Sequence, residues 1–147
     1  MKNHRLIQIA SVLLVVLFGA QYVLGMLLNF YVDLDGVDIA KGSFQDTLDA
    51  GFYYAAGSGG LLTMHWLNAS ILLFLALTLI ALGVARRARW AWGHGLVIVL
   101  TIMAASAGGA AFIGYHDDRL SMLMAIAFPI AFGTALSAAF LSFYRQD

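Results

Sequence analysis

Four long apolar runs dominate this chain and determine what it can fold into. They cover about residues 6–32, 60–85, 93–115 and 120–143, and none has Asp, Glu, Lys or Arg in its interior. A helix needs roughly 20 apolar residues to cross the hydrocarbon core of a bilayer. Because lipid offers no hydrogen-bond partners, the backbone of each run is satisfied internally only if it is helical. The runs predict an all-α, integral membrane four-helix bundle that forms one transmembrane domain over residues 1–147.

The composition excludes several classes of function. Hydrophobic residues make up 62% of the chain and charged residues 11%, whereas about 25% of the residues in a soluble domain are charged. The chain has no cysteine and no glutamate, which excludes disulfides, zinc–thiolate sites, iron–sulfur clusters and catalysis by glutamate. It also lacks a basic patch for nucleic acid and the common catalytic motifs. The sequence therefore predicts no nucleic-acid partner and gives no positive indication of an enzyme.

The basic residues predict the orientation in the membrane. Six lie before the first run, between the second and third, or after the fourth, and only two lie in the other loops. Under the positive-inside rule, both termini and the loop between the second and third runs are cytoplasmic. The first run is much longer than the core of a signal peptide and shows no small-x-small cleavage site, so we expect a retained helix. The predicted location is a bacterial plasma membrane, with the lipid bilayer as the first partner.

The predicted outer loop, residues 33–59, is the only sizeable extramembrane segment. Ile39, Phe44, Leu48 and Phe52 recur within it at nearly helical spacing, which predicts a short amphipathic helix on the outer surface. Such a helix acts either as a lid over a site or as a connector with its apolar side among the headgroups, and we favour the connector.

The connections between the runs predict how the helices pair. The third and fourth runs are separated by only about four residues, so their helices are antiparallel neighbours. The outer ends of the first and third runs are weakly similar, as are the beginnings of the second and fourth. We therefore expect two tandem helix hairpins related by a pseudo-twofold axis along the membrane normal.

His65 is the residue most indicative of chemistry, because ionisable side chains within a membrane are rare and usually face the bundle interior. It lies about one turn below the outer end of the second run, with Asn68 on the same face one turn deeper. Asn68 is placed to orient a ligand or a neighbouring backbone group. Gln21, in the first run, predicts an interhelical hydrogen bond. For His65, ligand binding and a plain interhelical hydrogen bond both stay open.

Methionines gather at the depth of His65. Imidazole and thioether ligands together suit a haem iron or Cu(I), and Met124 in the fourth run is the candidate second ligand. Met64 and Met122 add to a possible copper or lipophilic-ligand site. Methionine is also an ordinary filler of apolar cores, which is the more common role.

Two polar residues of the short connection extend the candidate site. His116 and Arg119 carry the positive or hydrogen-bonding groups that pair with haem propionates or another anion. The alternative is a solvated turn at the start of the fourth helix, and we favour that alternative.

The segment Met64–Ala69 is similar to the second-helix motif of the haem A synthase family, and residues 109–127 are similar to its stretch from the third helix into the fourth. The chain thus resembles one four-helix half of that family. This resemblance implies a bundle that binds haem b, with His65 and Met124 as axial ligands and Gly108 and Gly109 against the macrocycle. The family's fourth-helix histidine, outer-loop cysteine pair and acidic residue are missing, so its oxidation chemistry is not implied. The chain also resembles small four-helix membrane proteins common in bacteria.

Three functions stay open at this stage. The first is a haem-binding membrane protein that acts in electron transfer, haem sensing or haem handling. The second is a non-catalytic accessory or structural subunit, which packs against a membrane-protein partner or a second copy of the chain through small-residue faces. The third is a copper or lipophilic-ligand site around His65.

Overall fold

The computed structural model describes residues 4–34, 37, 39 and 42–144. Within this part of the chain the secondary structure is entirely helical. There are five helices: α1 (His4–Tyr31), α2 (Phe44–Gly57), α3 (Gly60–Ala85), α4 (Arg89–Tyr115) and α5 (Asp118–Tyr144).

Four of these helices are long and apolar enough to cross a membrane, namely α1, α3, α4 and α5. The predicted all-α fold with four membrane-length apolar helices is confirmed, and the apolar runs overlap these helices closely. The helix α4 begins at Arg89, four residues before the third run, and α5 begins at Asp118. The helices extend past the apolar runs because a charged side chain ends an apolar pattern without breaking the backbone hydrogen bonds.

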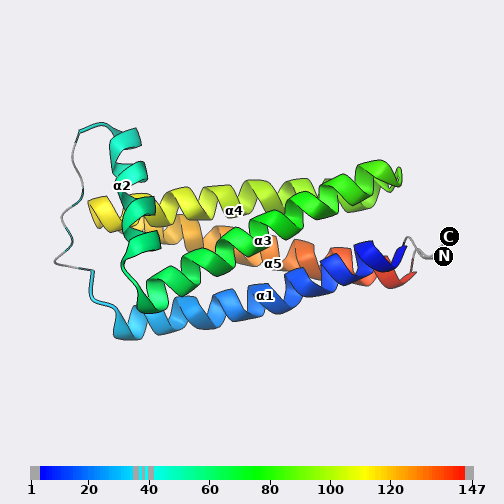
Figure 1. Ribbon diagram of the computed structural model, residues 1–147, viewed down its shortest axis with the longest axis horizontal. Coiled ribbons are helices and arrows are strands. Elements are labelled where there is room, and N and C mark those ends of the chain that lie inside the picture. Colours follow the sequence, from blue (N-terminus) through cyan, green and yellow to red (C-terminus); the bar gives the residue numbers. More distant parts are fainter. Residues whose placement is uncertain (1–3, 35–36, 38, 40–41, 145–147) are drawn as a thin grey trace.

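The four long helices surround a common axis in the order α1, α3, α4, α5, with α5 returning to α1 (Figure 1). The helices α4 and α5 pack against each other, as their short connection predicts. One end of the bundle holds α2 and the turn between α4 and α5, and we call it the α2 end. At the opposite end, α1 begins, α5 ends, and α3 turns into α4.

The hydrophobic core fills the middle of the bundle and the half opposite α2. All four long helices contribute to it, and on α5 the contributors are alanines at a helical spacing. The buried members include Ile7, Leu14, Phe18, Leu72, Leu79, Ile98, Ile102, Ala131, Ala135 and Ala138. No residue of α1 beyond Phe18 is buried. On α1, the half nearer α2 therefore contributes only partly buried or exposed side chains.

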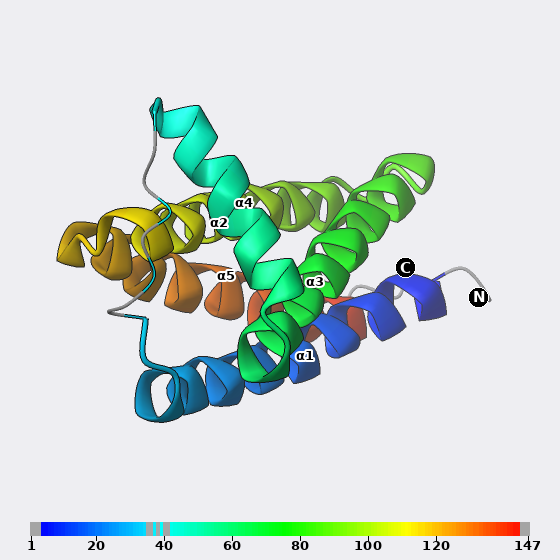
Figure 2. The same cartoon turned by 60° about the vertical axis from the view of Figure 1, so that its left-hand side comes forward.

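The helix α2 runs across the α2 end of the bundle and packs on α4 and α3 (Figure 2). Ser43 caps it, and the side chain and backbone of Ser43 pair reciprocally with Asp46. The backbone N–H and then the hydroxyl of Ser43 donate to the Asp46 carboxylate and hold its pKa below the ordinary 3.8. These contacts explain why the helix begins at Phe44.

The amphipathic helix expected in the outer loop is thus present, but its buried face differs from the one expected. Ile39 precedes the helix, and Phe44 is 57% exposed. The buried residues are Thr47, Gly51 and Ala55, one turn apart on one face. A Cβ at Gly51 would overlap the carbonyl oxygen of Ala110 on α4. Small residues let the two backbones approach, so α2 is docked on the bundle, with Leu48 and Phe52 partly buried beside this face.

Candidate ligand site at His65

The side chain of His65 leaves α3 on its inward face and meets α1. The Nε2 atom of Gln21, on α1, lies 2.8 Å from the Nε2 atom of His65. The ring also faces Gly25, where a Cβ would lie 3.5 Å from the Cε1 atom of His65. A hydrogen bond and a small residue one turn apart on α1 therefore set the position of the imidazole. The interhelical hydrogen bond expected of Gln21 is confirmed.

Asn68 fixes the direction of this hydrogen bond. Its Nδ2 atom donates to the backbone carbonyl of Leu17 over 3.0 Å and to the Oε1 atom of Gln21 over 2.7 Å. The carbonyl of Leu17 only accepts, so the Asn68 amide must present its nitrogen there. This orients Gln21 with its nitrogen toward His65. Asn68, 8% exposed, thus orients a neighbouring backbone and a side chain, as one of the sequence alternatives predicted.

The hydrogen bonds from Asn68 to Gln21 and from Gln21 to His65 determine which ring nitrogen of His65 carries the hydrogen. Gln21 donates to Nε2 of His65, so Nε2 is the acceptor nitrogen and Nδ1 carries the hydrogen. The Nδ1 atom is buried and has no hydrogen-bond partner among the described residues. A buried donor without an acceptor costs roughly 1–3 kcal/mol. The site therefore holds an N–H group whose acceptor the described part of the chain does not supply.

His94, on α4, shows how a histidine in these helices is satisfied. Its Nδ1 atom lies 2.6 Å from the carbonyl oxygen of Trp90, one turn back, and its Nε2 atom lies 3.0 Å from the hydroxyl of Ser137 on α5. Both nitrogens are thus paired. The ring of His65 instead turns toward α1, and its Nδ1 atom does not bond to the carbonyl one turn back.

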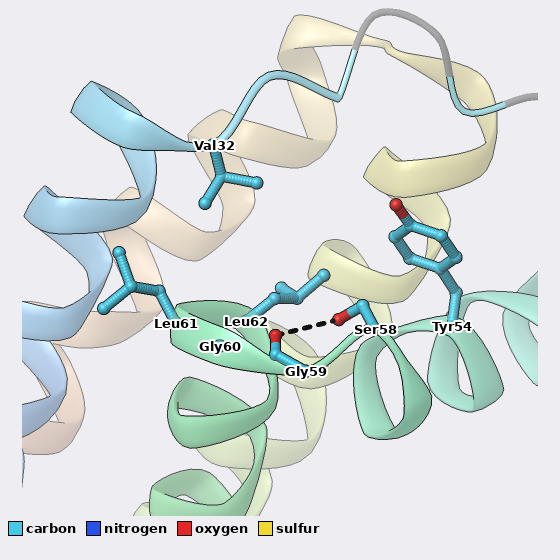
Figure 3. A pocket seen from close by; sticks show the side chains of 7 residues that line it. All are labelled: Val32, Tyr54, Ser58, Gly59, Gly60, Leu61 and Leu62. Carbon is cyan, nitrogen blue, oxygen red and sulfur yellow. Dashed lines mark hydrogen bonds between the residues drawn. The ribbon is translucent and has the colours of Figure 1, made fainter.

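A groove of about 310 Å³ opens at the α2 end, one turn from His65. Val32 after α1, Tyr54 on α2 and Leu61 on α3 surround it (Figure 3). The groove is lined by Val32, Tyr54, Ser58, Gly59, Gly60, Leu61 and Leu62. Side chains on a helix lean toward its N-terminus, so the His65 ring leans toward the turn that carries Leu61. Leu61 therefore lies one turn from His65 on the same face of α3.

Two of the three methionines that were grouped with His65 lie on the surface of the bundle. Met64 is 58% exposed and Met122 is 63% exposed, so both belong to the surface of the bundle. Met124 is half-buried, and its sulfur lies 3.1 Å from the position of a Cβ on Gly109. No group of three His, Cys, Asp or Glu side chains able to hold a metal ion occurs among residues 4–34, 37, 39 and 42–144.

His116 and Arg119 lie at the turn between α4 and α5. His116 ends α4 in a left-handed conformation, with φ of 52°, and its Nε2 atom lies 3.1 Å from the carbonyl oxygen of Val37. Arg119 is exposed, and its backbone N–H donates to the carboxylate of Asp117. In this structure His116 ties the loop to the bundle, and the turn has the capped geometry of the favoured alternative.

The arrangement does not fit the haem group that the resemblance implies. An axial nitrogen must offer a lone pair to iron, but the lone pair of Nε2 accepts from Gln21 and Nδ1 carries the hydrogen. The small-residue face of α4 is covered as well. A Cβ at Gly108 would lie 3.2 Å from the carbonyl oxygen of Leu120 on α5, and Gly109 faces the sulfur of Met124. Helix packing uses the surface that a macrocycle would need.

Comparisons with known proteins identify no relative: no protein-family model, curated protein or solved structure matches this chain. The resemblance to half of a haem A synthase stays a prediction.

The sequence did not identify the groove residues Val32, Tyr54 and Leu61. Each belongs to an apolar or aromatic pattern that carries no sign of a site, and three separate segments bring them together. Gln21 was identified as an interhelical donor, but its partner was not, since the register between α1 and α3 decides which residues meet.

Proposed function

We propose that this chain is an integral membrane protein that binds a lipid-soluble molecule through a hydrogen bond from Nδ1 of His65. The observation that carries the proposal is the buried Nδ1 atom without a partner among the described residues. Lipid tails offer no acceptor, so the unpaired N–H group destabilises the folded protein until a molecule with an acceptor oxygen binds.

The chemistry of the site favours a neutral carbonyl compound. The N–H group of an imidazole whose other nitrogen accepts a hydrogen bond is a single donor, which suits a carbonyl oxygen and offers nothing to a cation. The groove beside it is lined mainly by apolar side chains, such as Val32, Leu61 and Leu62. An isoprenoid quinone combines these properties, because it presents carbonyl oxygens on an apolar ring and dissolves in the bilayer. We therefore take a quinone as the class of ligand.

The route to His65 passes Leu61. Nδ1 is buried and Leu61 lines the groove one turn away, so we propose that a ligand entering from the groove displaces this side chain. Leucine can move from one staggered rotamer to another without keeping a strained torsion, whereas an unpaired buried donor costs roughly 1–3 kcal/mol. A ligand that supplies the acceptor can therefore hold the leucine aside.

The proposal includes an orientation. The end opposite α2 carries Arg86, Arg87 and Arg89, and the positive-inside rule makes that end cytoplasmic. The site at His65 then lies in the outer half of a bacterial plasma membrane. Two single-cysteine variants, Ser58→Cys and Arg87→Cys, test this orientation. Each is labelled in whole cells with a thiol reagent that does not cross the membrane. Labelling of Arg87→Cys but not Ser58→Cys would reverse the orientation.

Quinone binding is testable with the tryptophan beside His65. In a Trp90→Phe/Trp92→Phe background, Trp66 is the sole tryptophan of the chain. We expect decylubiquinone to quench its fluorescence saturably in detergent. His65→Phe keeps an aromatic ring but loses the donor, so its affinity should fall about tenfold, the equivalent of 1.4 kcal/mol. Ser70→Ala, which removes a hydroxyl bonded within α3, should bind like the parent.

Three outcomes would overturn the proposal. One is equal quenching in His65→Phe and the parent, and another is quenching that never saturates. The third is a visible Soret band in protein expressed with ample haem, lost in His65→Ala, which would restore the haem interpretation. Co-purification of a partner chain that His65→Phe leaves unchanged, together with no quinone binding, would favour the accessory-subunit alternative.

A further inference from the structure

A second groove, of about 440 Å³, lies between α4 and α5 in the half of the bundle opposite α2. Most of its lining comes from successive turns of α4, and Thr134 on α5 forms the facing wall. The lining residues are Arg89, Trp90, Gly93, His94, Val97 and Thr134. From Arg89 to Val97, α4 rises about 12 Å. This length approaches the ~15 Å of hydrocarbon in one leaflet.

The floor of this groove is open because of one glycine. No heavy atom lies within 4 Å of the position that a Cβ on Gly93 would take. The imidazole of His94 is held by Trp90 and Ser137, so it forms a fixed wall without an unpaired polar group. An apolar chain can therefore lie along α4 without leaving a buried hydrogen-bonding group unsatisfied.

The mouth of the groove is positively charged. Arg89 lines it, and Arg86 and Arg87 lie in the adjoining turn. Every carboxylate among the described residues lies at the α2 end of the bundle, either before α3 or at the turn into α5. No ion pair of Arg89 is found within residues 42–144. An arginine fork matches the geometry of a phosphate group and binds it with two parallel hydrogen bonds.

We propose that this groove binds one anionic phospholipid, with its phosphate at Arg89 and one acyl chain along Gly93 and Val97. The charge complementarity at the mouth and the apolar, leaflet-deep groove select this occupant over a free anion or a peptide. Basic sites between membrane helices bind anionic headgroups in this way. Under the orientation proposed above, the lipid belongs to the cytoplasmic leaflet, but its binding does not depend on His65.

Native mass spectrometry of the full chain tests this site. Protein reconstituted in vesicles of equal phosphatidylglycerol and phosphatidylcholine is released into detergent, and the retained lipids are counted. We expect one phosphatidylglycerol to be retained in preference to phosphatidylcholine. Gly93→Leu fills the groove and Arg89→Gln removes the charge, so each should lose that lipid.

Two matched variants serve as references. Gly133→Leu also adds a side chain in open space, on α5 outside the groove, and Arg5→Gln removes a charge on α1 at the same end. Both should retain the lipid. Equal retention of the two lipids, or retention of phosphatidylglycerol by Gly93→Leu, would overturn the proposal. Loss of a co-purifying peptide instead of a lipid in Gly93→Leu would also overturn it.

Discussion

Gln21 on α1 donates a hydrogen bond to Nε2 of His65 on α3 over 2.8 Å. This hydrogen bond determines what the imidazole can bind. It occupies the lone pair of Nε2, which a metal would need, and leaves Nδ1 as a hydrogen-bond donor. The direction follows from Asn68, which is anchored on the carbonyl of Leu17. A backbone group of α1 thus determines which atom of His65 is available to a ligand.

Asn68 should contribute measurably to stability. Asn68→Leu removes its two hydrogen bonds to α1 and leaves Gln21 without an anchor. Hydrogen bonds between membrane helices average about 0.6 kcal/mol and reach about 1.7, so we expect a loss of about 1–2 kcal/mol in the free energy of unfolding. Unfolding of detergent-solubilised protein measures this. The Ser70→Ala control should change it little, and an equally small change in Asn68→Leu would contradict the hydrogen-bond chain.

Leu61 should control access to His65. Leu61→Ala shortens the groove side chain that lies on the proposed route to His65, so decylubiquinone should bind faster. Leu61→Phe fills the same space without adding a tryptophan and should slow binding or abolish it. Stopped-flow quenching in protein whose native tryptophans at positions 90 and 92 are phenylalanine measures the rates. If Leu61→Ala and the parent bind at the same rate, the ligand does not reach His65 by this route.

Gly51 should be essential for docking α2. A Cβ there would overlap the backbone carbonyl of Ala110, which a side-chain rotation cannot relieve. Overpacking of this kind typically costs about 1–3 kcal/mol, so Gly51→Ala should lower stability and expose α2 to limited proteolysis. Gly57→Ala, in the same helix with no atom within 4 Å of its Cβ position, is the matched control and should be tolerated. Equal protease resistance of the two variants would show that the helices are not this close.

The start of α2 should weaken in acid. The pKa of Asp46 is lowered in the folded state, so its contribution is fully present above the unfolded value near 3.8 and is lost as pH falls through the folded pKa. The amide resonance of Ser43 in an NMR titration should report this pKa below 3.8. Ser43→Ala keeps the backbone donor but loses the hydroxyl, so the pKa of Asp46 should rise toward its ordinary value. No rise would mean that the hydroxyl does not hold the carboxylate.

The sequence predicted the four spans well, because an apolar run without charges has few alternatives in a membrane. The run at 60–85 coincides with α3, and the others differ from their helices by a few residues at the ends. The helix in the outer loop was predicted from large apolar residues, whereas the buried face uses Thr47, Gly51 and Ala55. Close backbone packing selects small residues, and a hydrophobicity pattern does not reveal them.

The candidate site was predicted in part. His65, Asn68 and Gln21 stand out as polar residues in apolar runs, and the structure brings all three together. Met124, His116 and Arg119 were associated with His65 through depth in the membrane and the resemblance. Depth alone does not specify which way a side chain faces, and in the structure Met124 packs on Gly109 while His116 bonds to the loop.

Quinone binding at His65 requires that the imidazole carry its hydrogen on Nδ1. Nitrogen NMR of the imidazole, with ¹⁵N-labelled histidine in lipid nanodiscs, distinguishes a protonated Nδ1 from a protonated Nε2, and His65→Phe identifies the signals. We predict a neutral ring with the hydrogen on Nδ1, and a shift of that N–H signal when decylubiquinone is added. A hydrogen on Nε2, or an Nδ1–H signal that the quinone leaves unchanged, would contradict it.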